Sequence, residues 1–293
     1  MPSLPVLRVL ARELLTTERA PRILEPDLVM DDPHKVAAYV QAGRPGGVMA
    51  PVYLFHCAQI CEVIQPGETV IDLACGPANQ LALVAQLNPD THFIGVDLSA
   101  EMLGRARAYI AELGLKNVEL RQGDIARLDG FDASSVDAVI STVALHHLPT
   151  VEHLNRTFAE VARVLRPGGG LYLVDFGHLK AEKSIEYFAN QYRDRQPELF
   201  TLDYLYSLRA AFRLADFDAA HEAHLKHAGR LFSTFLAPFF VAIKTPARRQ
   251  LSPELRMHLA AARANLPIYH KKDLQDLITF FRLGGLDSPA LRA

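Results

Sequence analysis

The chain has 293 residues, of which 49% are hydrophobic and 22% charged, so it can form one large α/β domain with additions or two domains. Its 31 Lys and Arg residues nearly balance 33 Asp and Glu residues, which gives no electrostatic reason to expect nucleic acid as the main partner. Apolar runs are too short for a membrane span, Arg8 and Arg12 interrupt the N-terminal region, and a cytoplasmic location is expected.

Residues 1–66 are predicted to form a helical N-terminal cap. Asp32 and Pro33 are an N-cap and a first-turn proline, and Gly43 is expected to end the helix that they begin. A second helix is expected over residues 50–64, before Pro66 and Gly67.

Residues 67–180 alternate between apolar strands and amphipathic helices, which predicts a parallel sheet covered by helices on both faces. The expected strands are residues 70–73, 92–96, 118–122, 136–141 and 171–175, and the expected helices are residues 79–87, 100–113 and 151–165. On such sheets, ligands bind at the carboxyl ends of the strands.

The stretch Thr69–Ala85 is the centre of this pattern, because a strand passes through a glycine turn into a helix N-terminus. A dinucleotide fingerprint would place glycines where the sequence has Ala74, Gly76 and Ala78, so only one remains. Asp72 would repel a pyrophosphate but suits the positive amino group of S-adenosylmethionine (SAM). The turn therefore favours SAM over NAD.

Polar side chains follow the neighbouring strands at the same edge of the predicted sheet, namely Asp97, Asp124 and Ser141. Asp97 lies about twenty residues beyond the glycine turn, the spacing at which a carboxylate reaches a ribose. Aspartates are also common as helix caps at such junctions. With Asp72, the two aspartates make three acids in register, which favours a ligand site.

Together these motifs resemble a class I SAM-dependent methyltransferase of the small-molecule type over residues 72–176. The resemblance rests on Asp72-Leu73-Ala74-Cys75-Gly76, Phe93-Ile94-Gly95-Val96-Asp97, Gly123-Asp124-Ile125 and Leu165-Arg166-Pro167-Gly168-Gly169-Gly170, with Ala in place of two glycines of the first motif. It implies a Rossmann-like sheet of seven strands, mostly parallel, and SAM as the cofactor. The residues that it implies for cofactor binding are Asp72, Ala74 and Gly76 at the methionine end, Asp97 and Leu98 at the ribose, Asp124 and Ile125 at the adenine, Ser141 near the sulfonium, and Tyr39 from the cap.

The segment after the fourth strand is informative about the acceptor. It lacks the Asn/Asp-Pro-Pro-aromatic loop of nucleic-acid amino methyltransferases and the paired-glutamate loop of protein arginine methyltransferases. A small-molecule acceptor is therefore expected. His146, His147 and His178 are candidate catalytic residues on the acceptor side, where a base helps only if the acceptor must lose a proton. A structural role for these histidines remains an alternative.

The remaining segments are additions to the core. Residues 181–228 form an aromatic helical insertion that we expect to be a lid, although an ordinary helix core would also use such residues. Residues 229–246 are expected to form the closing antiparallel hairpin, and residues 247–293 a helical extension. Its stripe Leu274, Leu277, Ile278 and Phe281 must pack on the same chain or on a second subunit of a homodimer. His221, His224 and His227 fan around a helix, so no metal site is expected.

The sequence therefore predicts a SAM-dependent methyltransferase whose small-molecule acceptor lies between the core and an aromatic lid, with methyl transfer by in-line displacement. Three alternatives stay open. They are methylation of RNA or protein, a SAM-binding partner subunit without turnover, and another use of SAM or its decarboxylated form on the same scaffold.

Overall fold

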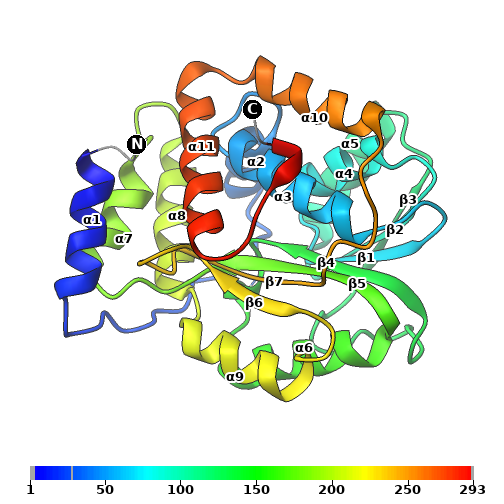
Figure 1. Cartoon of the computed structure of the whole chain (residues 1–293), viewed down its shortest axis with the longest axis horizontal. Helices are drawn as coiled ribbons and strands as arrows, with labels where there is room; N and C mark the ends of the chain where they lie inside the picture. Colours follow the sequence, from blue (N-terminus) through cyan, green and yellow to red (C-terminus); the bar gives the residue numbers. More distant parts are fainter. Residues whose placement is uncertain (1–3, 28, 292–293) are drawn as a thin grey trace.

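The computed structural model describes residues 4–27 and 29–291. Its centre is a seven-stranded sheet (Figure 1). The strands are β1 (Thr69–Leu73), β2 (His92–Asp97), β3 (Val118–Gln122), β4 (Val136–Thr142), β5 (Leu165–Phe176), β6 (Arg230–Ser233) and β7 (Phe240–Lys244).

The strand order is β3-β2-β1-β4-β5-β7-β6, and β1 to β5 pair in parallel. The hairpin strand β7 pairs antiparallel to both β5 and β6. The predicted mostly parallel, Rossmann-like sheet with a closing antiparallel hairpin is therefore confirmed. β2 and β3 lie on one side of β1, and β4 and β5 lie on the other, so the direction in which successive strands are added changes at β1. The carboxyl ends of β1 and β4 therefore lie side by side.

Helices cover both faces of the sheet (Figure 1). One face carries α6 (Val151–Val164) and α9 (Leu214–His224), and the other carries α3 (Ala50–Val63), α4 (Asn79–Leu87), α5 (Ala100–Glu112), α10 (Pro253–Asn265) and α11 (Ile268–Leu283). Strand side chains alternate between two core clusters, so Val70 faces one layer of helices and Ile71 the other. Within residues 4–27 and 29–291, no helix is both long and apolar enough to cross a membrane.

Local sequence signals explain where several helices begin. Asp32 caps α2 (Pro33–Gly43), because its side chain accepts hydrogen bonds from the amides of His34 and Lys35. Ser99 and Thr150 cap α5 and α6 in the same way. The predicted start of the helix at Pro33 and its end at Gly43 are both confirmed.

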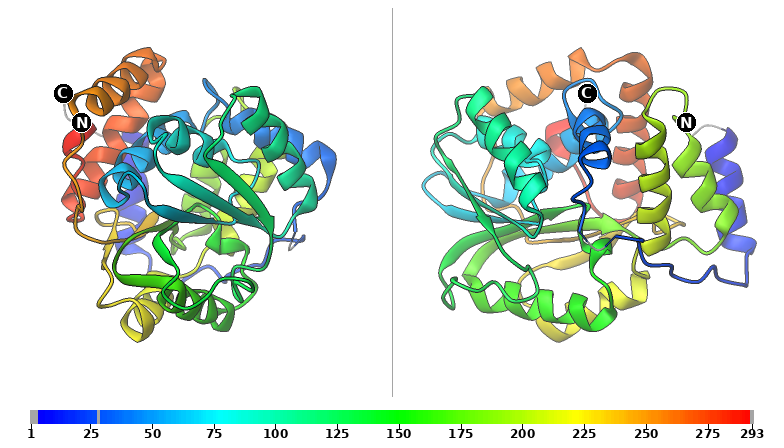
Figure 2. Two further views of the ribbon diagram at one scale, coloured as in Figure 1. Left: turned by 90° about the vertical axis from the view of Figure 1, so that its right-hand side faces the viewer. Right: turned by 180° about the vertical axis from the view of Figure 1, so that it is seen from behind.

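The N-terminal helices and part of the insertion gather at one end of the sheet. Here α1 (Leu4–Leu15) lies beside α7 (Glu182–Asn190), and α8 (Glu198–Ala210) packs against both α7 and α2 (Figures 1 and 2). The third helix of the insertion, α9, instead packs against α6 on the opposite face of the sheet because Phe217 enters the core there. Only α7 and α8 are therefore placed as a lid would be.

Strand β5 is longer than the predicted strand of residues 171–175. It begins at Leu165, which pairs with Val136, and the next paired residue is Gly170, opposite Ala138. The residues in between form an irregularity in the ladder, in which Gly168 has φ +75°. The predicted glycine-rich turn is thus an excursion inside the strand and does not precede it.

The C-terminal extension packs on its own chain. Leu274, Ile278 and Phe281 are buried, and the Phe281 ring stacks on Phe55 of α3 with a centroid distance of 5.0 Å and an interplanar angle of 9°. The predicted stripe therefore contacts α3, so of the two partners that we considered, the same chain is the one observed.

Truncating this contact should destabilise the fold. We expect Phe281→Ala to lower the free energy of unfolding by about 3 to 5 kcal/mol, because it leaves a cavity between α11 and α3. Leu283→Ala, which removes a 54% exposed side chain from the same helix, should change it by less than about 0.5 kcal/mol. Urea unfolding measures both variants, and an equal effect would contradict the packing described here.

Candidate functional site

A cavity of about 270 Å³ opens at the carboxyl ends of β1 to β4, and we call it the sheet-end cavity. Most of the predicted cofactor residues line it. These are Tyr39, Ala74, Gly76, Asp97, Leu98, Asp124 and Ile125, together with the predicted His147. Its position at the point where the strand order reverses is the one expected for a ligand on a parallel sheet.

The turn after β1 keeps a glycine-like backbone despite its alanines. Ala74, Gly76 and Ala78 have φ values of +53°, +54° and +60°, and α4 begins directly after them. An alanine in this left-handed region is strained by about 1 kcal/mol or more, so the surrounding structure must hold it. The loss of two glycines has therefore not changed the path of the chain at this corner.

Asp97 joins the ends of β1 and β2. Its Oδ2 accepts from the Gly76 amide at 2.7 Å, and its Oδ1 accepts from the Ser99 amide at 2.9 Å. Burial raises the pKa of Asp97, although these two amides favour its charged form. The carboxylate is thus fixed in place at the cavity wall, where its remaining lone pairs can accept from a ligand hydroxyl.

The far end of the cavity is formed by the residues after β2 and β3. Leu98 is 50% exposed and presents an apolar side chain, and Ile125 is buried beside it in the lining. Asp124 uses one oxygen to accept from the Ala126 amide at 2.8 Å. Together they offer two apolar surfaces and one acceptor, as a flat heterocycle with an amino group would require.

Two of the residues predicted to bind the cofactor do not line the sheet-end cavity. Ser141 is fully buried and donates to the Leu73 carbonyl at 3.0 Å, so its hydroxyl stabilises the strand pair. Asp72 is buried at the end of β1, where burial and the nearby Asp97 raise its pKa well above the ordinary value. Thr142 and Gln80 carry buried side-chain polar atoms without a partner among the described residues.

The chain leaves β4 through a strained residue. Val143 has φ +54°, which is rare for a β-branched side chain, and its amide donates to the Val174 carbonyl at 2.8 Å. The following short helix, η1 (Leu145–His147), then places His147 in the lining of the sheet-end cavity. Strain of this kind is concentrated at binding sites, where the surrounding structure holds it.

His147 forms an ion pair with Glu25. The Nδ1 atom of His147 lies 2.6 Å from Oε2 of Glu25, whose other oxygen accepts from Ser207 at 2.7 Å. Burial opposes both charges, but their mutual attraction outweighs it, which lowers the pKa of Glu25 to about 2 and raises that of His147 to about 9. The His147 Nε2 atom is the ring nitrogen that Glu25 does not engage.

The other two candidate histidines are held differently. His146 is buried, and its Nδ1 and amide nitrogen lie 2.7 Å and 2.6 Å from the two oxygens of Asp175. His178 is buried and does not line the sheet-end cavity, and burial lowers its pKa. Among these three, His147 alone lines the sheet-end cavity.

The segment 20–31, apart from residue 28, lies along the sheet-end cavity and was not predicted to contribute. Arg22 donates to the carbonyls of His146, Leu148, Pro149 and Ala210 at 2.7 to 3.2 Å. Val29 and Met30 line the cavity, and Ser99 donates to the Met30 carbonyl at 3.0 Å. The segment has no hydrophobic periodicity, so no local pattern predicts that Arg22 and Glu25 reach the site.

Glu25, His146 and His147 also meet the basic requirement for a metal site. One ligand atom from each lies within 4.8 Å of the others, which makes them the group among the described residues that could hold an ion. In the structure, His147 pairs with Glu25 and His146 with Asp175. Glu25 and His147 therefore already satisfy each other, and His146 is held by Asp175 from outside this group.

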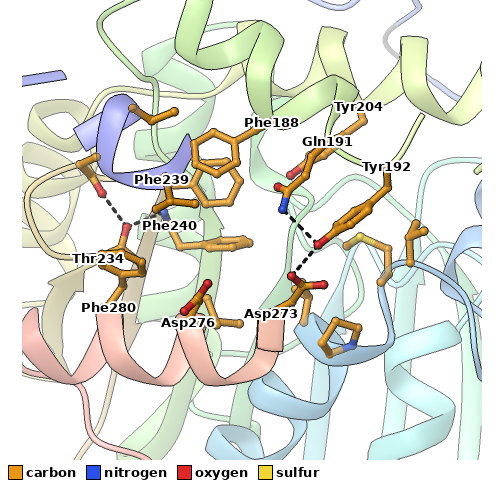
Figure 3. A pocket seen from close by; sticks show the side chains of 18 of the residues that line it. Phe188, Gln191, Tyr192, Tyr204, Thr234, Phe239, Phe240, Asp273, Asp276 and Phe280 are labelled. Carbon is orange, nitrogen blue, oxygen red and sulfur yellow. Dashed lines mark hydrogen bonds between the residues drawn. The ribbon is translucent and has the colours of Figure 1, made fainter. Parts of the chain in front are cut away.

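A second cavity, of about 160 Å³, lies among α1, α7, α8, α11 and the β6–β7 connection (Figure 3). We call it the aromatic cavity because Phe188, Tyr192, Phe200, Tyr204, Phe235, Phe239, Phe240 and Phe280 line it. Phe200 of this lining is in contact with Tyr39 of the sheet-end cavity, with ring centroids 6.2 Å apart. The linings of the two cavities therefore touch at these two side chains.

The Glu25–His147 pair should contribute to stability in a limited pH range. We expect Glu25→Gln to lower the free energy of unfolding by about 1 to 3 kcal/mol, because it leaves a protonated imidazole without its partner. A raised histidine pKa stabilises the fold below 6.5 and loses its effect as pH rises through 9, and a lowered glutamate pKa stabilises it above 4.5. The difference from wild type should therefore be largest between pH 4.5 and 6.5 and shrink toward pH 9.

Chemical unfolding at several pH values measures this effect. Glu18→Gln, which changes an exposed glutamate near the same segment, is the matched control and should behave as wild type. A pH-independent loss in Glu25→Gln would show that the ion pair is not the stabilising interaction.

The central part of the chain is similar to known methyltransferases. Residues 70–169 match the family described as a methyltransferase domain. An arsenite methyltransferase of Halobacterium salinarum is 42% identical over 111 residues, which are 38% of this chain and 27% of the relative. A demethylmenaquinone methyltransferase of Listeria monocytogenes is 35% identical over 113 residues, 38% of this chain and 46% of the relative. This chain thus spans less than half the length of these curated relatives.

Solved structures share the fold over a longer range. A SAM-dependent methyltransferase from Aquifex aeolicus has a TM-score of 0.51 at 17% identity and covers 74% of this chain and 98% of its own. A protein described as a SAM-dependent methyltransferase from Methanococcus maripaludis has a TM-score of 0.53 at 16% identity, with 79% and 99% covered. Residues 70–169 thus match a methyltransferase domain, and the chain shares the fold of these SAM-dependent methyltransferases.

Proposed function

We propose that this protein transfers the methyl group of SAM to a small, largely apolar organic acceptor. The observation that carries the proposal is the presence of two neighbouring cavities whose linings touch at Phe200 and Tyr39, one of them built from the methyltransferase motif residues and the other from aromatic side chains. An enzyme that joins a polar nucleoside cofactor to an apolar acceptor needs such a pair of adjacent environments.

The residues of the sheet-end cavity fit SAM. Asp97 would accept from the ribose hydroxyls, Leu98 and Ile125 would contact the adenine faces, and Asp124 would accept from its amino group. The methionine end would lie by the turn at Ala74 and Gly76, close to the unpartnered polar atoms of Gln80 and Thr142. When bound, SAM supplies an electrophilic methyl group, and the protein contributes alignment and exclusion of water.

Asp72 and Ser141 would act from behind this surface. Asp72 adds negative charge close to Asp97, which favours a cationic amino group and disfavours a pyrophosphate. Ser141 holds β4 against β1 through the Leu73 carbonyl. Tyr39 would close the cavity from α2.

The acceptor would lie between the core and the helices α7 and α8, which we propose as the lid. Arsenite, the substrate named for one relative, contains arsenic(III), a soft acceptor that thiolate ligands bind. Cys57, Cys61 and Cys75 are all buried, and no cysteine lines either cavity. The aromatic lining instead favours an apolar organic molecule, in the broad class to which the demethylmenaquinone named for the other relative belongs.

Two other uses of the domain predict different behaviour. An RNA or protein methyltransferase would bind a macromolecule with strong salt dependence. A SAM-binding subunit without turnover would bind S-adenosylhomocysteine but need no cavity for an acceptor, and the aromatic cavity argues against it.

Cofactor binding should depend on Asp97. We expect Asp97→Asn to raise the Kd for S-adenosylhomocysteine by about 10- to 100-fold, because the charge-assisted bonds to the ribose are weakened. Calorimetric titration measures this, with Asp132→Asn, an exposed acid, as the control that should bind like wild type. No binding of S-adenosylhomocysteine by the wild-type protein would refute the proposed function.

We propose His147 as the general base where the acceptor must lose a proton. Its pKa of about 9 means that it is protonated at neutral pH, so kcat should rise with pH up to about 9. His147→Gln should remove this rise and leave the affinity for S-adenosylhomocysteine unchanged. An identical pH profile in the variant would assign His147 a structural role. For His146 and His178, we propose a role in supporting the loop and none in the chemistry.

A further inference from the structure

The aromatic cavity has an acidic floor. Asp273 and Asp276 lie one turn apart on α11, and both side chains extend from that helix into the cavity (Figure 3). The rest of the lining is mainly apolar and comes from α1, the start of α3, α7, α8, the β6–β7 connection and other residues of α11. Two carboxylates in such surroundings are unfavourable unless hydrogen bonds or a cation compensate them.

Asp273 is only half satisfied by the protein. Its Oδ1 accepts from the Tyr192 hydroxyl at 2.5 Å, and that hydroxyl also accepts from Gln191 at 3.0 Å (Figure 3). Its Oδ2 is buried and has no hydrogen-bond partner among the described residues. Burial raises the pKa of Asp273, and the neighbouring Asp276 raises it further. The cavity therefore contains a hydrogen-bond acceptor, Asp273 Oδ2, for which the described residues supply no donor.

Asp276 has even fewer partners. In residues 4–27 and 29–291, its side chain forms no ion pair within 4.0 Å and no hydrogen bond. Among the described residues, the cations near the two carboxylates are Lys272 and Arg195; neither pairs with them, and Arg195 lies over the Tyr269 ring at 4.6 Å. The acidic floor thus retains net negative charge that the described residues do not neutralise.

The walls opposite the floor are aromatic. The rings of Phe188 and Phe239 are 4.1 Å apart and form one wall, and Tyr204 stacks on Phe200 at 6.1 Å to form another. Aromatic faces attract cations as well as apolar groups, and an ammonium close to both carboxylates and rings is stabilised by each. The charge pattern of the cavity is therefore complementary to a positive group attached to an apolar body.

We propose that the aromatic cavity binds a small apolar amine in its protonated form, with the ammonium group at Asp273 and Asp276 and the apolar body among Phe188, Phe239 and Phe280. The unpartnered Asp273 Oδ2 accepts a hydrogen bond from the ammonium group. Binding of the amine does not depend on the proposed methyl transfer. A role of the bound amine as the methyl acceptor would rest on that proposed function.

Calorimetry with a homologous series of arylalkylamines tests this binding, starting from 2-phenylethylamine. The matched probes are 2-phenylethanol, which is neutral, and 3-phenylpropionate, which is anionic. We expect the amines to bind at least 10-fold more tightly than the alcohol, and the carboxylate not to bind. Equal binding of alcohol and amine, or no binding of any amine in the series, would overturn the proposal.

Variants locate the site within the molecule. Asp273→Asn and Asp276→Asn keep the shape of the side chains and should each weaken amine binding about 10-fold or more. Glu254→Gln, an exposed acid on the adjacent helix α10, should leave it unchanged. Unaltered amine binding in both aspartate variants would show that the amine binds elsewhere.

Titration of the wild-type protein with S-adenosylhomocysteine, beside the amine series, separates the two proposals. Normal cofactor binding together with absent amine binding would reject the amine site and leave the methyltransferase proposal standing. Amine binding without cofactor binding would reject the proposed function and keep the amine site.

Discussion

The structure depends on one carboxylate that holds two strand ends together. Asp97 accepts from the Gly76 amide on one side and the Ser99 amide on the other, so the turn after β1 and the start of α5 are fixed relative to each other. Charge-assisted bonds of this kind are stronger than neutral ones, and both lie where water is largely excluded. The same group then faces the sheet-end cavity, so the geometry of the fold and the recognition of a ligand share one side chain.

The sheet and the motif residues were predictable because they depend on local periodicity and short spacings. The strand positions, the helix at Asn79 and the cap at Asp32 all follow from signals within a few residues of each other. The contribution of Glu25 was not predictable, because its partner His147 lies 122 positions later in the chain. No periodic pattern marks the segment that contains Glu25. The bulged start of β5 was missed because glycine-rich residues signal a turn more strongly than a strand.

The placement of the insertion shows the same limit. Aromatic residues between 181 and 228 predicted a lid, but composition does not tell which face of the sheet a helix will cover. Phe217 takes α9 to the opposite face, and Phe188 and Tyr204 place α7 and α8 along the aromatic cavity. Similarly, the stripe on α11 predicted a partner, and only the three-dimensional packing against Phe55 identified it.

The alanines at 74 and 78 have a consequence for the dynamics of the ligand corner. A glycine at either position would adopt the required backbone without strain but would sample many more conformations when the chain is unfolded or the corner opens. Alanine exchanges that freedom for a strained but narrower range of shapes. A loop that is already confined loses less conformational entropy when a ligand arrives, so the restricted backbone of the two alanines favours ligand affinity.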